Sequence, residues 1–472
     1  MSAMVLPSKP DPRRRPVRPS PRRGGPRKPG WLARLFRSWF GPRFKPDPYR
    51  YRAYQSRQSV LRLDVRLPAV DDVGALRQAL VERELQPRES GWTFYLAPGP
   101  ALERMVPDLA DVYGPDVGLK ILKDLQPPED AIYATQELAL GGRAKRRPLA
   151  PSPAGLLRIA GLLHSAGLGP RVHDLVHLNA GGSDLSAYVV DHVAWKVTEA
   201  STYRAFMRRL RPVLKSGLLA TLAGKIDTDN DFPAPDCNDN LRLDPTNGEP
   251  LYVDFQAFTI PDETRLIATF ARDALAHAGG DRRRLYQSIP GAMPGLRDTE
   301  ARTAAIAALL RKPNLDIENR LVFDIGCNSG LMMAEALAAG ALWTYGWDHV
   351  PVAQGAARIL AALGASRATV FGETLGPDSD LAGMLPAHHR LRGDGVLLYL
   401  GVDQAIGYPP GIGYLPWQLM VFEGEAGSDI GAAWRRLQQT GWFGDGGLLA
   451  HTLLADGDGL PLPLLLARRR RR

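Results

Sequence analysis

Residues 321–348 place the strongest constraint on the fold of this 472-residue chain, because they combine a strand, a glycine-rich turn, a helix and a second strand that ends in an acid. The apolar run 321–323 is typical of a strand buried on both faces, and 331–339 predicts an apolar helix. Residues 343–345 predict a second strand, with Asp348 just past it. Such a unit can hold a nucleotide-type cofactor, since the helix N-terminus offers free N–H groups and the acid can bind a ribose.

The turn inside this unit does not match the dinucleotide fingerprint G-x-G-x-x-G, because its glycines are separated by three residues. A nicotinamide-dependent enzyme is therefore a less favoured interpretation, and a glycine turn without any ligand is another alternative. The segment resembles motif I of the class I S-adenosylmethionine (SAM)-dependent methyltransferases. The resemblance implies that the cofactor is bound by Asp324, Gly326, Asn328, Gly330 and, at its ribose, Asp348.

The rest of the C-terminal region fits the same α/β Rossmann-like fold. Apolar runs at 395–400 and 417–423 predict further buried strands, and 447–454 with 461–467 predict a closing hairpin-like pair. We place the methyltransferase-like domain at 316–467. The residues expected near the adenine and the methyl acceptor are Glu373, Asp403, Gln404 and Tyr408, but the sequence does not identify a base.

A second constellation lies upstream. The alternating run 117–123 predicts a strand that carries Lys120. Further on, Asp236 and Asn240 precede a short hairpin, and Asp254 follows an apolar run. An acid can orient an attacking hydroxyl, while Asn and Asp oxygens can hold a hard cation against phosphates.

These residues resemble the site of the protein-kinase-like fold, especially that of small-molecule and lipopolysaccharide kinases. The resemblance implies an α+β two-lobed domain at 59–295 that binds ATP and Mg²⁺. In it Asp236 would be the catalytic acid and Lys120 the phosphate-binding lysine, and the metal ligands would be Asn240 and Asp254. The spacing from Asp236 to Asn240 is one residue shorter than in that family, and the helix expected at 155–165 has no glutamate to pair with Lys120.

The charge is concentrated at the N-terminus. The chain is +9 overall, but residues 1–57 hold 16 Lys or Arg against two Asp, so the remainder is −5. We expect 1–48 to be a disordered basic tail, except for an amphipathic helix at 31–40. Its aromatic face and flanking basic residues indicate peripheral membrane contact through 31–45, with docking on protein or an RNA arm as alternatives.

Composition excludes several classes. Two cysteines, Cys237 and Cys327, give no disulfide framework or zinc pattern, and no apolar run is long enough to span a bilayer. We expect a cytoplasmic protein, peripheral on the inner face of the membrane.

The two regions together are similar to bifunctional kinase–methyltransferases that cap a surface polysaccharide, although the domain order is reversed here. This interpretation predicts a glycan or lipid-linked substrate. The alternative is an RNA or metabolite methyltransferase whose kinase-like module is inactive; nucleic acid is the less favoured partner because the acidic body lacks a basic patch. A non-enzymatic, membrane-tethered interaction protein is disfavoured by the intact unit at 324–348, and the sequence leaves the oligomeric state open.

Overall fold

A computed structural model of the chain describes residues 50, 60–89, 93–123, 153–193, 200–221, 240–263, 265–270, 285–444, 446–455 and 459–470. These residues belong to one compact unit, Phe44–Arg472. The predicted tail 1–48, its helix 31–40 and Asp236 lie outside the described residues. Among the residues that are described, no helix is both long and apolar enough to cross a membrane.

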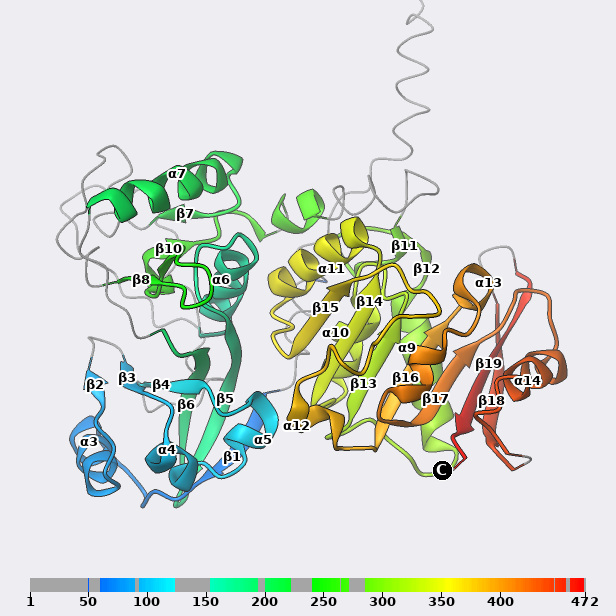
Figure 1. The fold of residues 1–472 in the computed structure, drawn as a ribbon, viewed down its shortest axis with the longest axis horizontal. Coiled ribbons are helices and arrows are strands. Elements are labelled where there is room, and N and C mark those ends of the chain that lie inside the picture. The colour runs from blue at the N-terminus through cyan, green and yellow to red at the C-terminus, as the bar shows by residue number, and fades with distance from the viewer. Residues whose placement is uncertain are drawn as a thin grey trace, which may run out of the picture. The chain divides into compact units, whose positions relative to one another are not determined.

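The N-terminal region is built on a six-stranded sheet with the order β1-β5-β6-β4-β3-β2 (Figure 1). Its strands are β1 (Leu61–Val65), β2 (Arg88–Glu89), β3 (Thr93–Leu96), β4 (Val117–Leu122), β5 (Val172–Ala180) and β6 (Ser183–Asp191). Neighbouring strands are antiparallel, except that β1 runs parallel to β5. Its helices are α3 (Val73–Glu82), α4 (Pro100–Met105), α5 (Leu109–Tyr113) and α6 (Pro153–Ser165). The predicted strand around Lys120 is therefore β4, in the interior of this sheet.

A smaller set of elements follows. It comprises α7 (Ala200–Ser216), the pair β7 (Ala220–Thr221) and β10 (Phe258–Thr259), the hairpin β8 (Leu241–Leu243) and β9 (Pro250–Tyr252), and the 3-10 turn η2 (Phe255–Ala257). Helix α7 buries Tyr203, Phe206, Met207 and Leu210. This i, i+3, i+4, i+7 spacing places them on one face, so α7 is held by its apolar stripe.

The C-terminal region is a seven-stranded sheet with the order β15-β14-β13-β16-β17-β19-β18. The strands are β13 (Leu321–Ile325), β14 (Trp343–Asp348), β15 (Ala368–Gly372), β16 (Gly395–Leu400), β17 (Trp417–Glu423), β18 (Leu448–Ala455) and β19 (Pro461–Arg468). All pairs from β15 to β17 are parallel, while β19 is antiparallel to both of its neighbours. This confirms the predicted Rossmann-like α/β architecture and its closing antiparallel pair.

The connections of this sheet explain where a ligand can bind. The helices are α10 (Leu331–Ala338), α11 (Val350–Leu363), α12 (Ala387–Arg390), α13 (Asp403–Ile406), α14 (Ile430–Gln438) and the 3-10 turn η3 (Pro410–Tyr414). From β13 the chain proceeds outward to β14 and β15, and then crosses back to β16 on the other side of β13. Strand order therefore reverses between β13 and β16, and such switch points leave a crevice at the C-terminal ends of the strands.

The segment before the sheet also packs against it. Strand β11 (Leu285–Gln287) pairs in parallel with β12 (Gly295–Arg297), and α9 (Thr299–Arg311) follows. Asp298 caps α9, because its side chain accepts a hydrogen bond from the Ala301 N–H at 3.1 Å. Helix α9 contacts α10, β18 and β19, so residues 285–311 are part of the surroundings of the C-terminal sheet.

Candidate functional site

The turn between β13 and α10 has an uncommon backbone. Gly326, Asn328 and Gly330 all have positive φ, at 72°, 50° and 75°. Glycine adopts this left-handed region freely and asparagine tolerates it, so the residue types fit the turn. A Cβ at Gly326 would lie 2.4 Å from Val402 Cγ1, and one at Gly330 would lie 2.9 Å from Leu360 Cδ1. The glycines are therefore required by the turn and its protein neighbours, a reason that the sequence pattern did not reveal.

Hydrogen bonds connect the turn to the C-terminal end of β14. The Gly326 and Cys327 N–H groups both donate to the Trp347 carbonyl, at 2.8 and 3.1 Å. Asp348 Oδ2 accepts from the Asn328 N–H at 2.9 Å, and Asp348 Oδ1 accepts from the His349 N–H at 2.9 Å. The structure thus brings the predicted turn and the predicted ribose-binding acid together. His349 Nδ1 also lies 2.7 Å from Asp348 Oδ1, whereas the second lone pair of Oδ2 leaves Asp348 capacity to accept from a ligand.

Asp324 lies at the end of β13 and is fully buried, yet its Oδ2 atom has no hydrogen-bond partner among the described residues. Burial raises the pKa of Asp324 to about 7, while the positive charge of Arg302 acts in the opposite direction and Asp348 raises it further. A buried carboxylate oxygen without a donor is costly, so this atom indicates a place where a ligand could donate.

Gln287 of β11 holds the start of α10 from outside the sheet. Its Oε1 atom accepts from the Leu331 N–H at 3.0 Å and from Ser329 Oγ at 3.1 Å. Sequence reasoning missed Gln287, because no local pattern connects residue 287 to a turn more than forty residues away.

A buried ion pair lies close to the same edge. Arg302 Nε donates to Glu423 Oε2 at 2.6 Å, and Arg302 Nη2 donates to Glu423 Oε1. The same nitrogen donates to the Tyr286 hydroxyl at 3.3 Å. Both charged side chains are almost completely buried, with 4% of Arg302 and 1% of Glu423 exposed. A Cβ at Gly401, just after β16, would lie 3.1 Å from Glu423 Oε1 and 3.2 Å from the Tyr286 hydroxyl oxygen, so this group borders the ends of β16 and β17.

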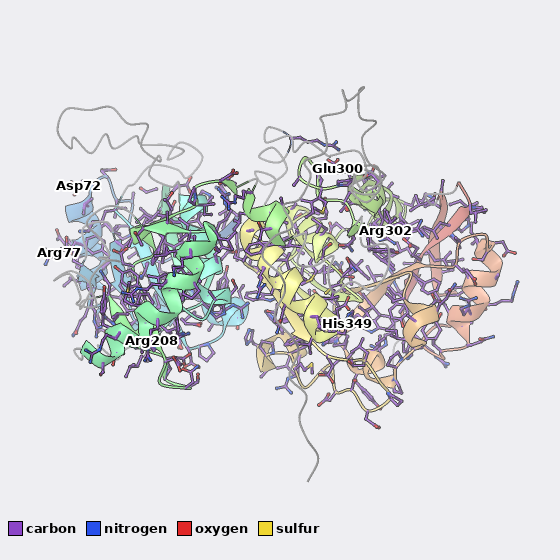
Figure 2. All side chains as sticks on the ribbon, turned by 90° about the horizontal axis from the view of Figure 1, so that it is seen from above. Asp72, Arg77, Arg208, Glu300, Arg302 and His349 are labelled. Carbon is purple, nitrogen blue, oxygen red and sulfur yellow. The ribbon has the colours of Figure 1, made fainter. Side chains whose placement is uncertain are left out.

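Arg302 belongs to α9, and Figure 2 labels it beside Glu300 on that helix. No sequence pattern assigned a role to Arg302, Glu423 or Tyr286. A signal existed for Glu423 alone, since it is an acid at the C-terminal end of the buried strand 417–423.

The residues expected on the acceptor side are distributed around this edge. The Glu373 N–H, directly after β15, donates to the Asp348 carbonyl at 2.8 Å. Asp403 is buried and its Oδ2 accepts from Arg436 Nη1 at 2.7 Å, while Gln404 is exposed. The Tyr408 ring stacks on Tyr399 with 5.6 Å between centroids. Asp403 is thus already paired with Arg436.

The upstream constellation is brought together in part. Lys120 Nζ donates to the Val253 carbonyl at 2.8 Å and lies 5.1 Å from the centre of the Phe255 ring. Burial lowers the pKa of Lys120 to about 8, and the nearby Asp254 carboxylate opposes that change. The Val253 N–H donates to the Asn240 carbonyl at 2.8 Å, so Asn240, Asp254 and Lys120 share one neighbourhood. Within the described part of the chain, no cluster of three His, Cys, Asp or Glu residues could hold a metal ion.

No protein-family model matches the sequence, and no curated protein matches it. Several solved structures are similar to part of the chain. A proposed RNA methyltransferase from Pyrococcus horikoshii has 13% identity over 38% of this chain and 88% of its own, with a TM-score of 0.27. Magnesium protoporphyrin IX methyltransferase from Synechocystis PCC 6803, solved with bound SAH, has 18% identity over 43% and 100%, with a TM-score of 0.28. Precorrin-6y C5,15-methyltransferase from Geobacter metallireducens GS-15 has 14% identity over 37% and 91%, with a TM-score of 0.25. Each of these similarities spans less than half of this chain.

Proposed function

We propose that the C-terminal region is a SAM-dependent methyltransferase. The observation that carries the proposal is the group formed at the switch point by the left-handed turn 326–330, the acid Asp348 and the unpartnered Asp324 Oδ2 atom. An adenosyl ligand with an amino-acid end offers a diol for Asp348 and an ammonium group for Asp324. When bound, the cofactor supplies an electrophilic methyl group.

The chain's own residues would then bind and orient. Asp348, tied to the turn through the Asn328 N–H, fixes the ribose against the end of β14. The acceptor would then lie against the loop after β16, which begins at Gly401, and the end of β17 at Glu423. An acceptor that is already anionic needs orientation more than deprotonation, which suits an edge without an assigned base.

Calorimetry with S-adenosylhomocysteine (SAH) tests this proposal on the full-length protein. We expect the wild-type protein to bind SAH and the Asp348→Ala variant to lose at least tenfold in affinity, because a charge-assisted hydrogen bond to the ribose is removed. Asp378→Ala, at an exposed acid in the same region, is the matched control and should bind as wild type does. Wild-type protein that does not bind SAH would overturn the assignment.

A second proposal concerns the upstream region, as an ATP- and Mg²⁺-dependent kinase-like domain. The observation that favours it is the proximity of Lys120 to Asp254, since phosphotransferases of this type need a lysine near a metal-binding acid. A glutamate partner for Lys120 on α6 is lacking, and the lysine instead donates to the Val253 carbonyl. An inactive nucleotide-binding module is the alternative.

Thermal shift separates these readings. If Asp254 and Asn240 hold Mg²⁺ against phosphates, ATP should raise the melting temperature only when Mg²⁺ is present, and Asp254→Ala should remove that increase. Asp262→Ala, at an exposed acid of the same region, should retain it. A shift without turnover on any acceptor would favour the inactive module, and the absence of a shift would end the proposal.

For the methyl acceptor we propose a hydroxyl or phosphate of a glycan, because a neighbouring kinase-like site would act on the same class of group. Transfer of labelled methyl from SAM to a lipid-linked glycan fraction should exceed transfer to total RNA. Label recovered mainly in RNA would instead support the alternative of an RNA methyltransferase.

A further inference from the structure

The Arg302 guanidinium makes hydrogen bonds through two of its three nitrogen atoms within the described residues. Its Nε and Nη2 atoms are engaged by Glu423 and Tyr286, whereas Nη1 is buried and has no hydrogen-bond partner within the described residues. Guanidinium is planar and keeps its charge, so the two contacts to Glu423 fix the plane in which Nη1 lies. A buried N–H donor without an acceptor raises the free energy of the folded protein, which suggests that a ligand supplies the acceptor.

Asp324 presents the complementary acceptor. Its Oδ2 atom is also buried and unpartnered, and Arg302 is near enough for its charge to act on this carboxyl. The two side chains come from different elements, β13 and α9, and they do not form an ion pair with each other. One edge of the sheet therefore carries an unpaired cationic donor and an unpaired carboxylate oxygen.

A single kind of ligand group matches both. In an α-amino acid the carboxylate and the ammonium group are attached to the same carbon, so each needs a partner of opposite charge within a few ångströms of the other. We propose that Arg302 Nη1 donates to the carboxylate, and Asp324 Oδ2 accepts from the ammonium group, of the amino-acid end of the methyl donor. This inference rests on the proposed methyltransferase function and deepens it.

The segment that precedes the sheet, 285–311, also contacts the proposed cofactor site. Tyr286, Gln287 and Arg302 all come from 285–311, and together they contact the turn, the start of α10 and the end of β17. The cofactor site would thus be built from the Rossmann-like sheet and from this preceding segment. Arg302 is a binding residue in this scheme, whereas Glu423 and Tyr286 are positioning residues that act through it.

The test compares two adenosyl thioethers by calorimetry on the full-length protein. SAH carries the amino-acid end and 5′-methylthioadenosine lacks it, so their affinity ratio isolates that end. Wild-type protein should prefer SAH. Arg302→Gln should lower the affinity for SAH by about 10- to 100-fold, the range for a lost charge-assisted hydrogen bond, and change that for methylthioadenosine by less than about twofold. Asp324→Asn should reduce the same preference.

Two further variants guard against a loss of folding. Arg302→Gln combined with Glu423→Gln removes the buried cation together with the carboxylate that pairs with it, and it should fold while still lacking the preference for SAH. Arg311→Gln, at an exposed arginine of the same helix, is the matched control and should retain the wild-type ratio.

The outcomes separate the two proposals. Wild-type protein that binds neither compound refutes the methyltransferase assignment. Wild-type protein that prefers SAH, with Arg302→Gln retaining the preference, refutes this inference alone and means that water satisfies Nη1. Equal losses for both compounds in the single and double variants would also refute it, because they indicate a structural role.

Discussion

Asp324 is a single residue whose carboxyl group is buried and whose Oδ2 atom has no hydrogen-bond partner among the described residues. An ionised carboxylate in a buried site is penalised by desolvation, and the nearby negative charge of Asp348 adds to the penalty. Arg302 is the group that opposes this, but its charge is largely neutralised by Glu423. A cationic ligand group next to Asp324 would therefore lower the free energy of its ionised form.

The burial of the Asp324 carboxyl predicts that the stability of the fold depends on pH. Burial raises the pKa of Asp324 from its ordinary 3.8 to about 7. Between those two pH values the folded protein keeps a proton that the unfolded chain has released. The free energy of unfolding therefore falls by about 1.4 kcal/mol for each pH unit by which the pH rises. The Asp324→Asn variant lacks this titration. We expect it to gain about 2 kcal/mol relative to wild type between pH 5 and pH 7, measured by urea unfolding.

Asp378→Asn, at an exposed position, is the control for that measurement and should show no such gain. A difference between wild type and Asp324→Asn that stays constant from pH 5 to pH 7 would show that the carboxyl titrates normally.

At the scale of elements, helix α10 depends on a side chain outside its own segment. The first N–H groups of a helix lack partners within it, and the Leu331 N–H is satisfied by Gln287 from β11. Gly330 at the N-cap position has no side chain that could do so. The short strand β11 thus contributes to the helix N-terminus that faces the proposed cofactor.

Replacing Gln287 with Met should therefore destabilise the protein by about 1–3 kcal/mol, because the buried Leu331 N–H and the Ser329 hydroxyl lose their acceptor while the apolar volume is kept. Chemical denaturation followed by fluorescence measures this change. Gln404→Met, at an exposed glutamine, should stay within about 0.5 kcal/mol of wild type. A similarly small effect for Gln287→Met would mean that solvent replaces the amide.

The elements of the C-terminal sheet could be predicted from sequence, and the contacts between them could not. Strands β16 and β17 were predicted with the bounds observed, because uninterrupted apolar runs between turn residues are typical of strands buried on both faces. The turn 324–330 and Asp348 were also found, since they follow one another along one βαβ unit. The pair of Arg302 and Glu423 joins residues 121 positions apart, so it depends on the tertiary fold. Asp236 lies outside the described residues and stays a prediction.

At the scale of the whole molecule, the N-terminal and C-terminal sheets share a core. A single buried apolar cluster includes Leu157 of α6 and Leu360 of α11. Gly161 allows these helices to approach closely, because a Cβ there would lie 3.2 Å from the Ala361 Cβ. We therefore expect the two sheets to unfold in one cooperative transition.

A buried ion pair also connects the two sheets. Arg367, just before β15, places Nε 3.0 Å from Oδ2 of Asp174 in β5. The Tyr113 hydroxyl donates to Asp174 Oδ2 at 2.8 Å, and Ser366 Oγ donates to Oδ1 at 3.0 Å. Arg367 Nη1 in turn donates to the Ala341 carbonyl at 3.2 Å. The pair is thus embedded in a hydrogen-bonded network, in which removal of one partner leaves the other charge buried.

This network predicts a large and non-additive effect of substitution. Arg367→Met should destabilise the protein by about 3–5 kcal/mol, because Asp174 would be left buried without its cation. Adding Asp174→Asn should recover part of that loss, since the uncompensated charge is then removed. The double variant should therefore be more stable than the sum of the two single effects implies.

Calorimetry of the four proteins in a double-mutant cycle measures the coupling, with Arg358→Met on α11 as a comparison outside the pair. Additive effects would mean that the two charges do not stabilise each other, and two separate transitions in the wild type would mean that the sheets fold independently of this contact.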